Sequence, residues 1–550
     1  MLHAEGPLLE VNLRDQTTTV HEIDDLLSEF IGGRGLATKL AHDRIPFDAD
    51  PLGANNRAYL STGPLQVSRM SFTGRMNMTA LSPLTDGLLS TNAGGYLSRN
   101  FADTGFSAVE LTGTSEELIA IHVSDEGVEF EPVPDLEQAE VPAVTRYMER
   151  RHGLEDEHLV TIGPGGENLV RFACVMTYDS RAFGRGGLGA VLGSKNVKCL
   201  SFRGDSRPEV DLPDDLEMEI HRSAATTDDM MKRQGTTAGT ETINEQFSLP
   251  TRYFSEYSFE HAADIGGDAV EAKKYEKAAC SVCAFACKLP TRDEAAGVET
   301  EGPEYETVFS FGSNQGVGDV VEVMKANELC DRYGLDTISC GNVIAAYLAA
   351  NDEFGNAELA QELVGKIAFR EDEGDRLAEG VQGAAEHLGV EDYSVKGMDF
   401  AAHDGRVLQG TGLSYAVANR GGDHMYSVIH RLQYNGELDP NGTADKPGVL
   451  VRRENYCAIR DSAIICAFSD GGYIDPDHLE GLLQTDWDDL QRIGSRVVDL
   501  ERHFFNQRGV DTEADRLPYD LPDLEESLAR YYDLRGWTDD GVVPDERIAG

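Results

Sequence analysis

The sequence predicts an α+β protein of several domains, in which a β-rich part precedes mainly helical parts. Its 550 residues are too many for one ordinary domain, because single hydrophobic cores stop growing at roughly 250–300 residues. A composition break rich in Asp, Pro and Ser lies near Arg203–Asp215. Short strand-like segments precede this break, and helical periodicity dominates after it.

Five segments before the break are predicted to be β-strands. Their apolar residues alternate or run together, and Gly, Pro, Asp and Asn separate the segments from one another. The predicted strands are Leu8–Leu13, Arg57–Leu60, Ala108–Leu111, Leu118–Val123 and Leu159–Ile162.

Segments after the break have apolar residues at helical spacing. One of them begins with Asp475-Pro476, a favourable N-cap followed by proline in the first helical turn. The predicted helices are Asp319–Tyr333, Thr337–Asn351, Asn356–Arg370, Asp375–Leu388, Asp475–Leu483 and Trp487–Phe505.

A second break near Val395–Asp404 divides the helical part of the chain. We therefore predict three domains, over residues 1–205, 206–395 and 396–550. We find no repeat of solenoid period.

The chain is strongly acidic, with a net charge of −49 from 97 acidic and 48 basic residues. Salt screens the self-repulsion of such a surface, since the Debye length falls to about 3 Å at 1 M. We interpret the charge as adaptation to a salt-rich cytoplasm, with an ordinary acidic enzyme as the alternative. The charge argues against nucleic acid and anionic membranes as partners, because both need a basic surface.

No targeting or membrane segment is predicted. The N-terminal residues Met1–Gly6 lack a basic region and an apolar region. The longest apolar stretch, around Val343–Ala350, is far shorter than the roughly 20 residues that span a bilayer. Nine cysteines in a chain of this kind indicate metal or redox chemistry rather than disulfides. We therefore expect a cytoplasmic protein.

The strongest chemical signal is Cys280-Ser-Val-Cys283-Ala-Phe-Ala-Cys287. Three thiolates at this spacing can converge on one inorganic core, and three clustered cysteines with one remote cysteine are typical of iron–sulfur proteins. Zinc sites usually have a second cysteine pair or paired histidines; a zinc site and buried structural cysteines are the alternatives. Spacing alone does not choose the fourth ligand among Cys174, Cys199, Cys330, Cys340, Cys457 and Cys466.

Several glycine- and arginine-rich stretches lie in the first part of the chain. Glycine lets the backbone approach a phosphate and present N–H donors, and arginine adds bidentate contacts. A single glycine is as often a plain turn, and a single arginine a surface charge, so the prediction depends on the set. The stretches are Gly32–Leu36, Ser71–Arg75, Ser82–Thr85, Asn92–Gly95, Gly163–Phe172 and Arg181–Lys195.

With these motifs the sequence resembles the aldehyde ferredoxin oxidoreductase family along nearly its whole length, as an acidic, haloarchaeal-like member. That family binds its cluster with a C-x2-C-x3-C triad and a distant cysteine that ends a D-x-x-G-L-C motif. Asp461-Ser-Ala-Ile-Ile-Cys466 matches this motif, with Ile464 where the family usually has glycine, and Asp331-Arg-Tyr-Gly-Leu-Asp336 matches its companion. The resemblance implies one [4Fe–4S] cluster bound by Cys280, Cys283, Cys287 and Cys466.

The resemblance also implies a bis-pterin centre with tungsten or molybdenum, and a Mg²⁺ ion that bridges the pterin phosphates. The implied fold is a β-sheet N-terminal domain that forms a base for the pterins, followed by two mainly α-helical domains. Arg75 is expected between the cluster and the pterin. The other implied pterin-binding residues are Asn92, Gly94, Arg181, Ala182, Gly184, Arg185 and Gly186 from the first domain, Asp331, Leu335 and Asp336 for one pterin, and Asp461 and Ile465 with Cys466 for the other.

The implied activity is the oxidation of aldehydes to carboxylic acids, with electrons passing through the cluster to ferredoxin. The family places an active-site glutamate in its P-E-Y-E segment, and the sequence does not decide between Glu304 and Glu306. That glutamate would take a proton, and His424 would hydrogen-bond the carbonyl oxygen. Some members have an iron at a homodimer interface; Lys325 stands where a glutamate ligand is expected, so we predict no such iron, and a homodimer only by analogy.

Three alternatives to this function are kept. A tungstoenzyme of the same superfamily with another substrate, such as a hydroxyacid oxidoreductase or a ring-reductase subunit, would have every cofactor motif. A non-catalytic iron–sulfur electron-transfer protein would contain iron and sulfide but no pterin. A zinc-structured binding protein would be colourless.

Overall fold

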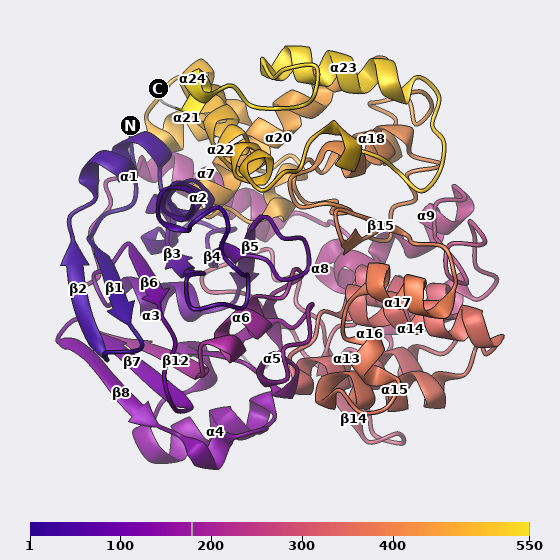
Figure 1. Cartoon of the computed structure of the whole chain (residues 1–550), viewed down its shortest axis with the longest axis horizontal. Helices are drawn as coiled ribbons and strands as arrows, with labels where there is room; N and C mark the ends of the chain where they lie inside the picture. Colours follow the sequence, from indigo (N-terminus) through magenta and orange to yellow (C-terminus); the bar gives the residue numbers. More distant parts are fainter. Residues whose placement is uncertain (178–179, 549–550) are drawn as a thin grey trace.

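Two six-stranded mixed β-sheets occupy the first 203 residues of the chain, and helices dominate the remainder (Figure 1). The structure is a computed structural model that describes residues 1–177 and 180–548. The predicted fold class, a β-sheet N-terminal part followed by mainly helical domains, is confirmed. The division at residues 205 and 395 stays a prediction.

The first sheet has the strand order β2-β1-β6-β3-β4-β5. The pair β1–β6 is parallel and every other pair is antiparallel. Its strands are β1 (Leu8–Asn12), β2 (Thr17–His21), β3 (Ala58–Ser61), β4 (Arg75–Leu81), β5 (Leu88–Gly94) and β6 (Ala108–Thr112).

The second sheet repeats this topology, with the order β8-β7-β12-β9-β10-β11 and β7–β12 as its one parallel pair. The first domain therefore consists of two equivalent halves, which the sequence analysis did not detect. Apolar residues of both sheets, such as Met78 and Leu200, share one buried core. The strands are β7 (Ile119–Ser124), β8 (Gly127–Pro132), β9 (Leu159–Thr161), β10 (Val175–Thr177), β11 (Arg181–Phe183) and β12 (Val197–Arg203).

The middle of the chain is a helical layer beside the sheets (Figure 1). Carboxylates begin its main helices: Asp319 accepts a hydrogen bond from Val321 N, and Asp336 accepts bonds from Ile338 N and Ser339 N. The single helix predicted over Asp375–Leu388 is wrong, because Gly380 with φ +92° separates two helices. The helices are α13 (Val320–Tyr333), α14 (Thr337–Asn351), α15 (Ala357–Phe369), α16 (Gly374–Leu377) and α17 (Val381–Leu388).

The C-terminal helices α20 (Pro447–Ser462) and α22 (Trp487–Gln507) pack on each other and on α2 (Gly33–Arg44) of the first part. Arg34 of α2 donates two hydrogen bonds of 2.8 Å to Glu501 of α22, and both side chains are buried. Asp475 caps α21 (Pro476–Leu483) as predicted. Within residues 1–177 and 180–548, no helix has the length and apolar character needed to span a bilayer.

Candidate cofactor site between the domains

Two adjoining cavities lie where the sheets meet the helical parts of the chain. Their volumes are about 240 and 280 Å³. Arg75, Asn92, Gly184 and Asp336 border both of them. Segments far apart in the sequence thus share one site.

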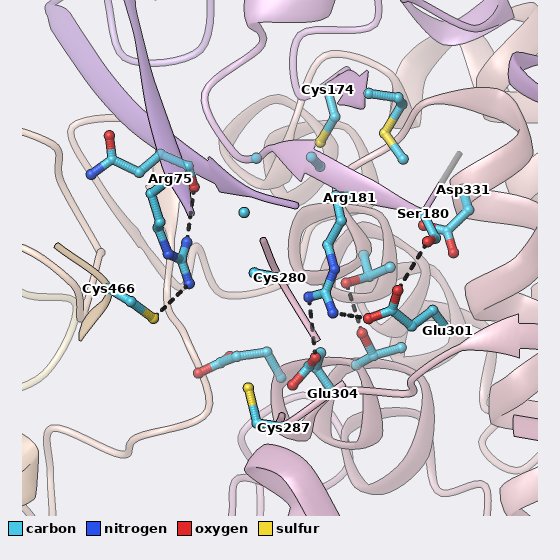
Figure 2. Close-up of a pocket in the computed structure, with 18 of the residues that line it drawn as sticks. Arg75, Cys174, Ser180, Arg181, Cys280, Cys287, Glu301, Glu304, Asp331 and Cys466 are labelled. Atoms are coloured by element: carbon cyan, nitrogen blue, oxygen red, sulfur yellow. Dashed lines mark hydrogen bonds and ion pairs between the residues drawn. The ribbon is translucent and has the colours of Figure 1, made fainter. Parts of the chain in front are cut away.

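The four cysteines of the predicted cluster border the first cavity, and Figure 2 shows Cys280, Cys287 and Cys466 among them. Their thiols are free and partly exposed. Arg75 donates from Nη2 to Cys466 Sγ at 3.3 Å, and from Nη1 to the carbonyl of Asn92 at 3.2 Å. Burial, together with the neighbouring Cys466 and Cys280, raises the pKa of the Cys287 thiol well above its ordinary value. Cationic iron would stabilise the thiolate form that burial disfavours, since thiolates are the usual ligands of iron–sulfur clusters.

Glycines of the first sheet allow the cysteine triad to approach closely. A Cβ on Gly94 would lie 3.1 Å from Cys280 Sγ, and a Cβ on Gly74 would lie 3.1 Å from Cys280 Cβ. The N–H of Ser281 donates to the carbonyl of Gly95 at 3.0 Å. The end of the β4–β5 hairpin therefore forms one wall of the thiol cluster.

Arg181 of β11 lies between Cys280 and Glu301 (Figure 2). It forms an ion pair with Glu301, and its Nη1 lies 3.8 Å from Glu304 Oε1. Glu304 also accepts a hydrogen bond from the hydroxyl of Thr236, and 38% of its side chain is exposed. Glu304 is therefore an ion-pair partner on the cysteine side.

Glu306 has a different environment. Its Oε2 accepts a hydrogen bond of 2.9 Å from Ala402 N, and its Oε1 lies 3.6 Å from Nε2 of both His424 and His403. Only 16% of its side chain is exposed. Burial raises the pKa of Glu306 above its ordinary value, and the nearby His424 offsets only part of this effect.

His403 and His430 lie close to the Glu306 carboxylate and were not predicted from the sequence. The rings of His403 and His430 stack at 3.9 Å, and Tyr434 Oη lies 3.2 Å from His403 Nδ1. Burial and neighbouring histidines lower the pKa of both imidazoles well below the ordinary value. Their proximity in sequence to His424, in a chain with 14 histidines, was the available signal.

Arg185 connects the first domain to both helical parts. Its Nη2 donates to the carbonyl of Asp399 at 2.6 Å, its Nε donates to Asp336 Oδ2 at 3.3 Å, and its Nη1 lies 3.8 Å from Asp423 Oδ2. Arg420 Nη2 donates to the carbonyl of Gly184 at 3.0 Å. Arg420 and Asp423, which border the second cavity, were also not predicted.

The two aspartate motifs are built alike. Asp331 lies in the last turn of α13 and Asp461 in the last turn of α20. The third residue after each aspartate is left-handed: Gly334 has φ +70° and Ile464 has φ +64°. Ile464 therefore occupies a conformation that favours glycine, which explains why the family usually has glycine there.

The ends of the two motifs are attached to equivalent carbonyls of the first domain. Asp336 N donates to the carbonyl of Phe172 at 3.2 Å, and Cys466 N donates to the carbonyl of Phe72 at 2.8 Å. The residues before them, Leu335 and Ile465, are 3% and 1% exposed. Each half of the first domain thus positions one loop.

Buried polar atoms without a hydrogen-bond partner among the described residues gather at these cavities. Leaving such a group unpaired costs about 1–3 kcal/mol. A bound group with many polar atoms would pair them, and a pterin cofactor with phosphates has such atoms. The atoms without a hydrogen bond are Arg75 Nε, Arg185 Nη1, Arg420 Nε, Asp423 Oδ2, His424 Nδ1 and Glu306 Oε1. Longer ion pairs of 3.6–3.8 Å still connect Asp423 Oδ2 to the two arginines and Glu306 Oε1 to the histidines.

Family models match nearly the whole chain. Residues 8–204 match "Aldehyde ferredoxin oxidoreductase, N-terminal domain", and residues 212–549 match "Aldehyde ferredoxin oxidoreductase, domains 2 & 3". The chain belongs to the aldehyde ferredoxin oxidoreductase family. It is therefore an oxidoreductase.

Similar proteins align with almost the full length of the chain. The tungsten-containing aldehyde ferredoxin oxidoreductase of Thermococcus kodakarensis is 34% identical over 98% of both chains. That of Pyrococcus furiosus is 32% identical over 99% of this chain and 98% of the relative. The aliphatic sulfonate oxidoreductase WOR-like subunit of P. furiosus is 26% identical over 98% and 96%.

A solved structure shares the fold of this aldehyde ferredoxin oxidoreductase family member. It is the active site complex BamBC of benzoyl coenzyme A reductase in complex with 1,5-dienoyl-CoA, with a TM-score of 0.84 and 19% identity over 100% of this chain and 97% of that chain.

Of the cofactor residues predicted from the sequence, Gly186 borders neither cavity. Its φ is +75°, and a Cβ at this position would lie 2.5 Å from Leu89 Cδ1.

Proposed function

We propose that this family member oxidises an aldehyde and water to a carboxylic acid, two protons and two electrons. Full-length relatives named tungsten-containing aldehyde ferredoxin oxidoreductases, at 34% and 32% identity, support this proposal. When bound, a tungsten bis-pterin would accept the electron pair and a [4Fe–4S] cluster would pass electrons singly to ferredoxin.

The residues available fit these groups. Cys280, Cys283, Cys287 and Cys466 would hold the cluster, and Arg75 would lie beside it. The loops that end at Asp336 and Cys466 would each hold one pterin, and a Mg²⁺ ion that accompanies the pterins is proposed from the family resemblance. The nitrogens of Arg75, Arg185 and Arg420 that make no hydrogen bond support an anionic cofactor at this position. Molybdenum is the alternative metal.

Glu306 is proposed as the catalytic base. The observation that supports it best is the position of its Oε1, 3.6 Å from two histidine Nε2 atoms in a largely buried setting. Its carboxylate would take the proton from the water or hydrate that supplies the second carboxyl oxygen. His424 would donate a hydrogen bond to the aldehyde oxygen and stabilise negative charge there. Glu304 is a weaker candidate because it pairs with Arg181.

The test compares Glu306→Gln with Glu304→Gln. Each variant keeps the size of the side chain and removes its charge. We expect Glu306→Gln to lower kcat by about 100-fold or more, since positioned proton transfer contributes about 10²–10⁴-fold, and Glu304→Gln to change it severalfold at most. The measurement is aldehyde-dependent reduction of a viologen dye, at equal tungsten and iron content. Equal losses in both variants would contradict the assignment.

The pH dependence gives a second measurement. Burial raises the pKa of Glu306, and a base must be ionised to act. Activity should therefore fall as the pH drops through a value higher than the ordinary glutamate pKa of about 4.3. An acid limb of kcat/KM at or below that ordinary value would exclude Glu306 as the base.

The sulfonate oxidoreductase at 26% identity supports one alternative, a tungstoenzyme that shares the cofactors but acts on another substrate. Formation of acid from simple aldehydes would favour the first proposal, and activity confined to sulfonates the second. We also propose a homodimer from the family resemblance, and a salt-rich cytoplasm as its location from the net charge of −49.

A further inference from the structure

A cluster of metal-binding side chains lies on the outer part of the second sheet, away from the cofactor cavities. His122 of β7, Glu131 of β8 and His152 at the end of α4 (Val141–His152) have ligand atoms within 4.8 Å of one another. The sheet order places β7 and β8 at the opposite edge from β11 and its Arg181. At about 4.8 Å per strand, that separation is roughly 20 Å.

We propose that His122, Glu131 and His152 bind a divalent transition-metal ion of the Zn²⁺ class. Two imidazole nitrogens and one carboxylate oxygen suit zinc and its first-row neighbours, whereas Mg²⁺ and Ca²⁺ prefer oxygen ligands alone. Water would complete the coordination.

The two carboxylate oxygens of Glu131 have different partners. Its Oε1 accepts hydrogen bonds from Arg151 Nε at 2.5 Å and Tyr147 Oη at 3.3 Å. Its Oε2 lies 3.2 Å from His122 Nε2 and 2.7 Å from His152 Nε2. Arg151 and Tyr147 thus orient the group, and the second oxygen stays directed at both imidazoles.

Supporting contacts also orient His122. Its Nδ1 lies 2.8 Å from Ser201 Oγ of β12, the residue paired with it in the sheet. When Nδ1–H donates to this hydroxyl, the lone pair of Nε2 is directed at the Glu131 oxygen, as in metal sites whose histidines are held through the other nitrogen.

The ligand atoms lie near the spacing that a metal ion requires. Bonds of about 2.0–2.2 Å in a tetrahedral arrangement separate ligand atoms by roughly 3.3–3.5 Å, compared with 3.2 and 2.7 Å for the two distances to Oε2. His152 can supply the difference, because 30% of its side chain is exposed. It ends a helix, where carbonyl dipoles favour a cation. A hollow of about 500 Å³, bordered by His122, Glu129 and His152, gives access from solvent.

The test is a Zn²⁺ titration of the full-length holoenzyme by calorimetry, after dialysis against a chelator. We expect one tight equivalent, weakened at least tenfold in His152→Gln and in His122→Gln. Substitution with Co²⁺ should give the visible absorption bands of a low-coordinate site, and anomalous scattering at the zinc edge should place the ion between the three side chains.

The matched control is His387→Gln. His387 also lies near the end of a helix, α17, and pairs with one carboxylate, Glu373, at 2.9 Å. This variant should bind Zn²⁺ as the wild type does. Equal affinity in the wild type and His152→Gln would overturn the proposal, as would an anomalous peak at another position.

Discussion

The loops that follow α13 and α20 have similar backbone conformations and differ in their last side chain. Both follow an aspartate in a final helical turn, pass through a left-handed residue, and donate an N–H to a phenylalanine carbonyl of the first domain. One ends at Asp336, which caps α14 and pairs with Arg185. The other ends at Cys466, whose sulfur accepts a hydrogen bond from Arg75.

The same loop backbone can therefore present either a helix-capping carboxylate or a thiol. The backbone hydrogen bonds fix where the sixth residue lies, so the identity of its side chain alone decides between a helix cap and a thiol at the cysteine cluster. An arginine from the first domain accompanies each ending. Exchanging the endings, or the left-handed residues, tests the comparison directly.

The largest effect is expected from Cys466→Asp, which gives the second loop the ending of the first. A carboxylate is a poor replacement for a thiolate ligand of an iron–sulfur cluster. We expect iron and sulfide per chain to fall and aldehyde oxidation to drop about 100-fold or more, because electrons could no longer leave. Metal analysis and electron paramagnetic resonance provide the measurement.

Cys457→Ala is the matched control for this exchange. Cys457 lies in α20, the helix before the Cys466 loop, and it is buried away from both cavities. Iron content should stay at the wild-type level in this variant. Full iron content in Cys466→Asp would show that the second ending is not a ligand.

A smaller effect, on stability, is expected from Gly334→Ala. Its φ of +70° disfavours a side chain, and the new Cβ would lie 2.9 Å from Gly163 N. Left-handed strain and overpacking together should cost about 2–4 kcal/mol, measured as a lower thermal midpoint. Gly365→Ala, with open space in the interior of α15, should raise the midpoint instead. A neutral Gly334→Ala would refute the argument from conformation.

The smallest effect separates conformation from packing at Ile464. Its side chain is buried against Gly33 and Gly63, so Ile464→Ala and Ile464→Gly both lose that packing. Only glycine also relieves the left-handed strain. Ile464→Gly should therefore be more stable than Ile464→Ala by about 1 kcal/mol, the reverse of their order in a helix. If Ile464→Ala were instead the more stable variant, the second loop would not have the left-handed conformation of the first.

Much of the candidate site could be predicted because its chemistry depends on residue type and short spacing. The cysteine triad and the two aspartate motifs are of this kind, and the structure brings them to one place. The choice between Glu304 and Glu306 could not be predicted. Glu304 precedes the short helix α12 (Tyr305–Thr307) and Glu306 lies within it, so their directions depend on a backbone turn that residue types alone do not specify.

The duplicated topology of the first domain was missed because strand pairing is a long-range property. Its local signal is weak: Gly63-Pro64 precedes Phe72 by the same interval as Gly163-Pro164 precedes Phe172. Those two phenylalanines provide the carbonyls that bind the two loops. His403 and His430 were missed for a related reason, since only the fold brings them to Glu306.

The attachment of Cys466 to Phe72 has a consequence for how the protein is made. A ribosome that adds about 5–20 residues per second needs roughly 10–35 s to pass from Cys287 to Cys466. During that interval the nascent chain contains three of the four thiols, and the loop that ends at Cys466 is missing from the cavities. The proposed cluster could therefore gain all four of its ligands only after Cys466 has been made and has reached Phe72.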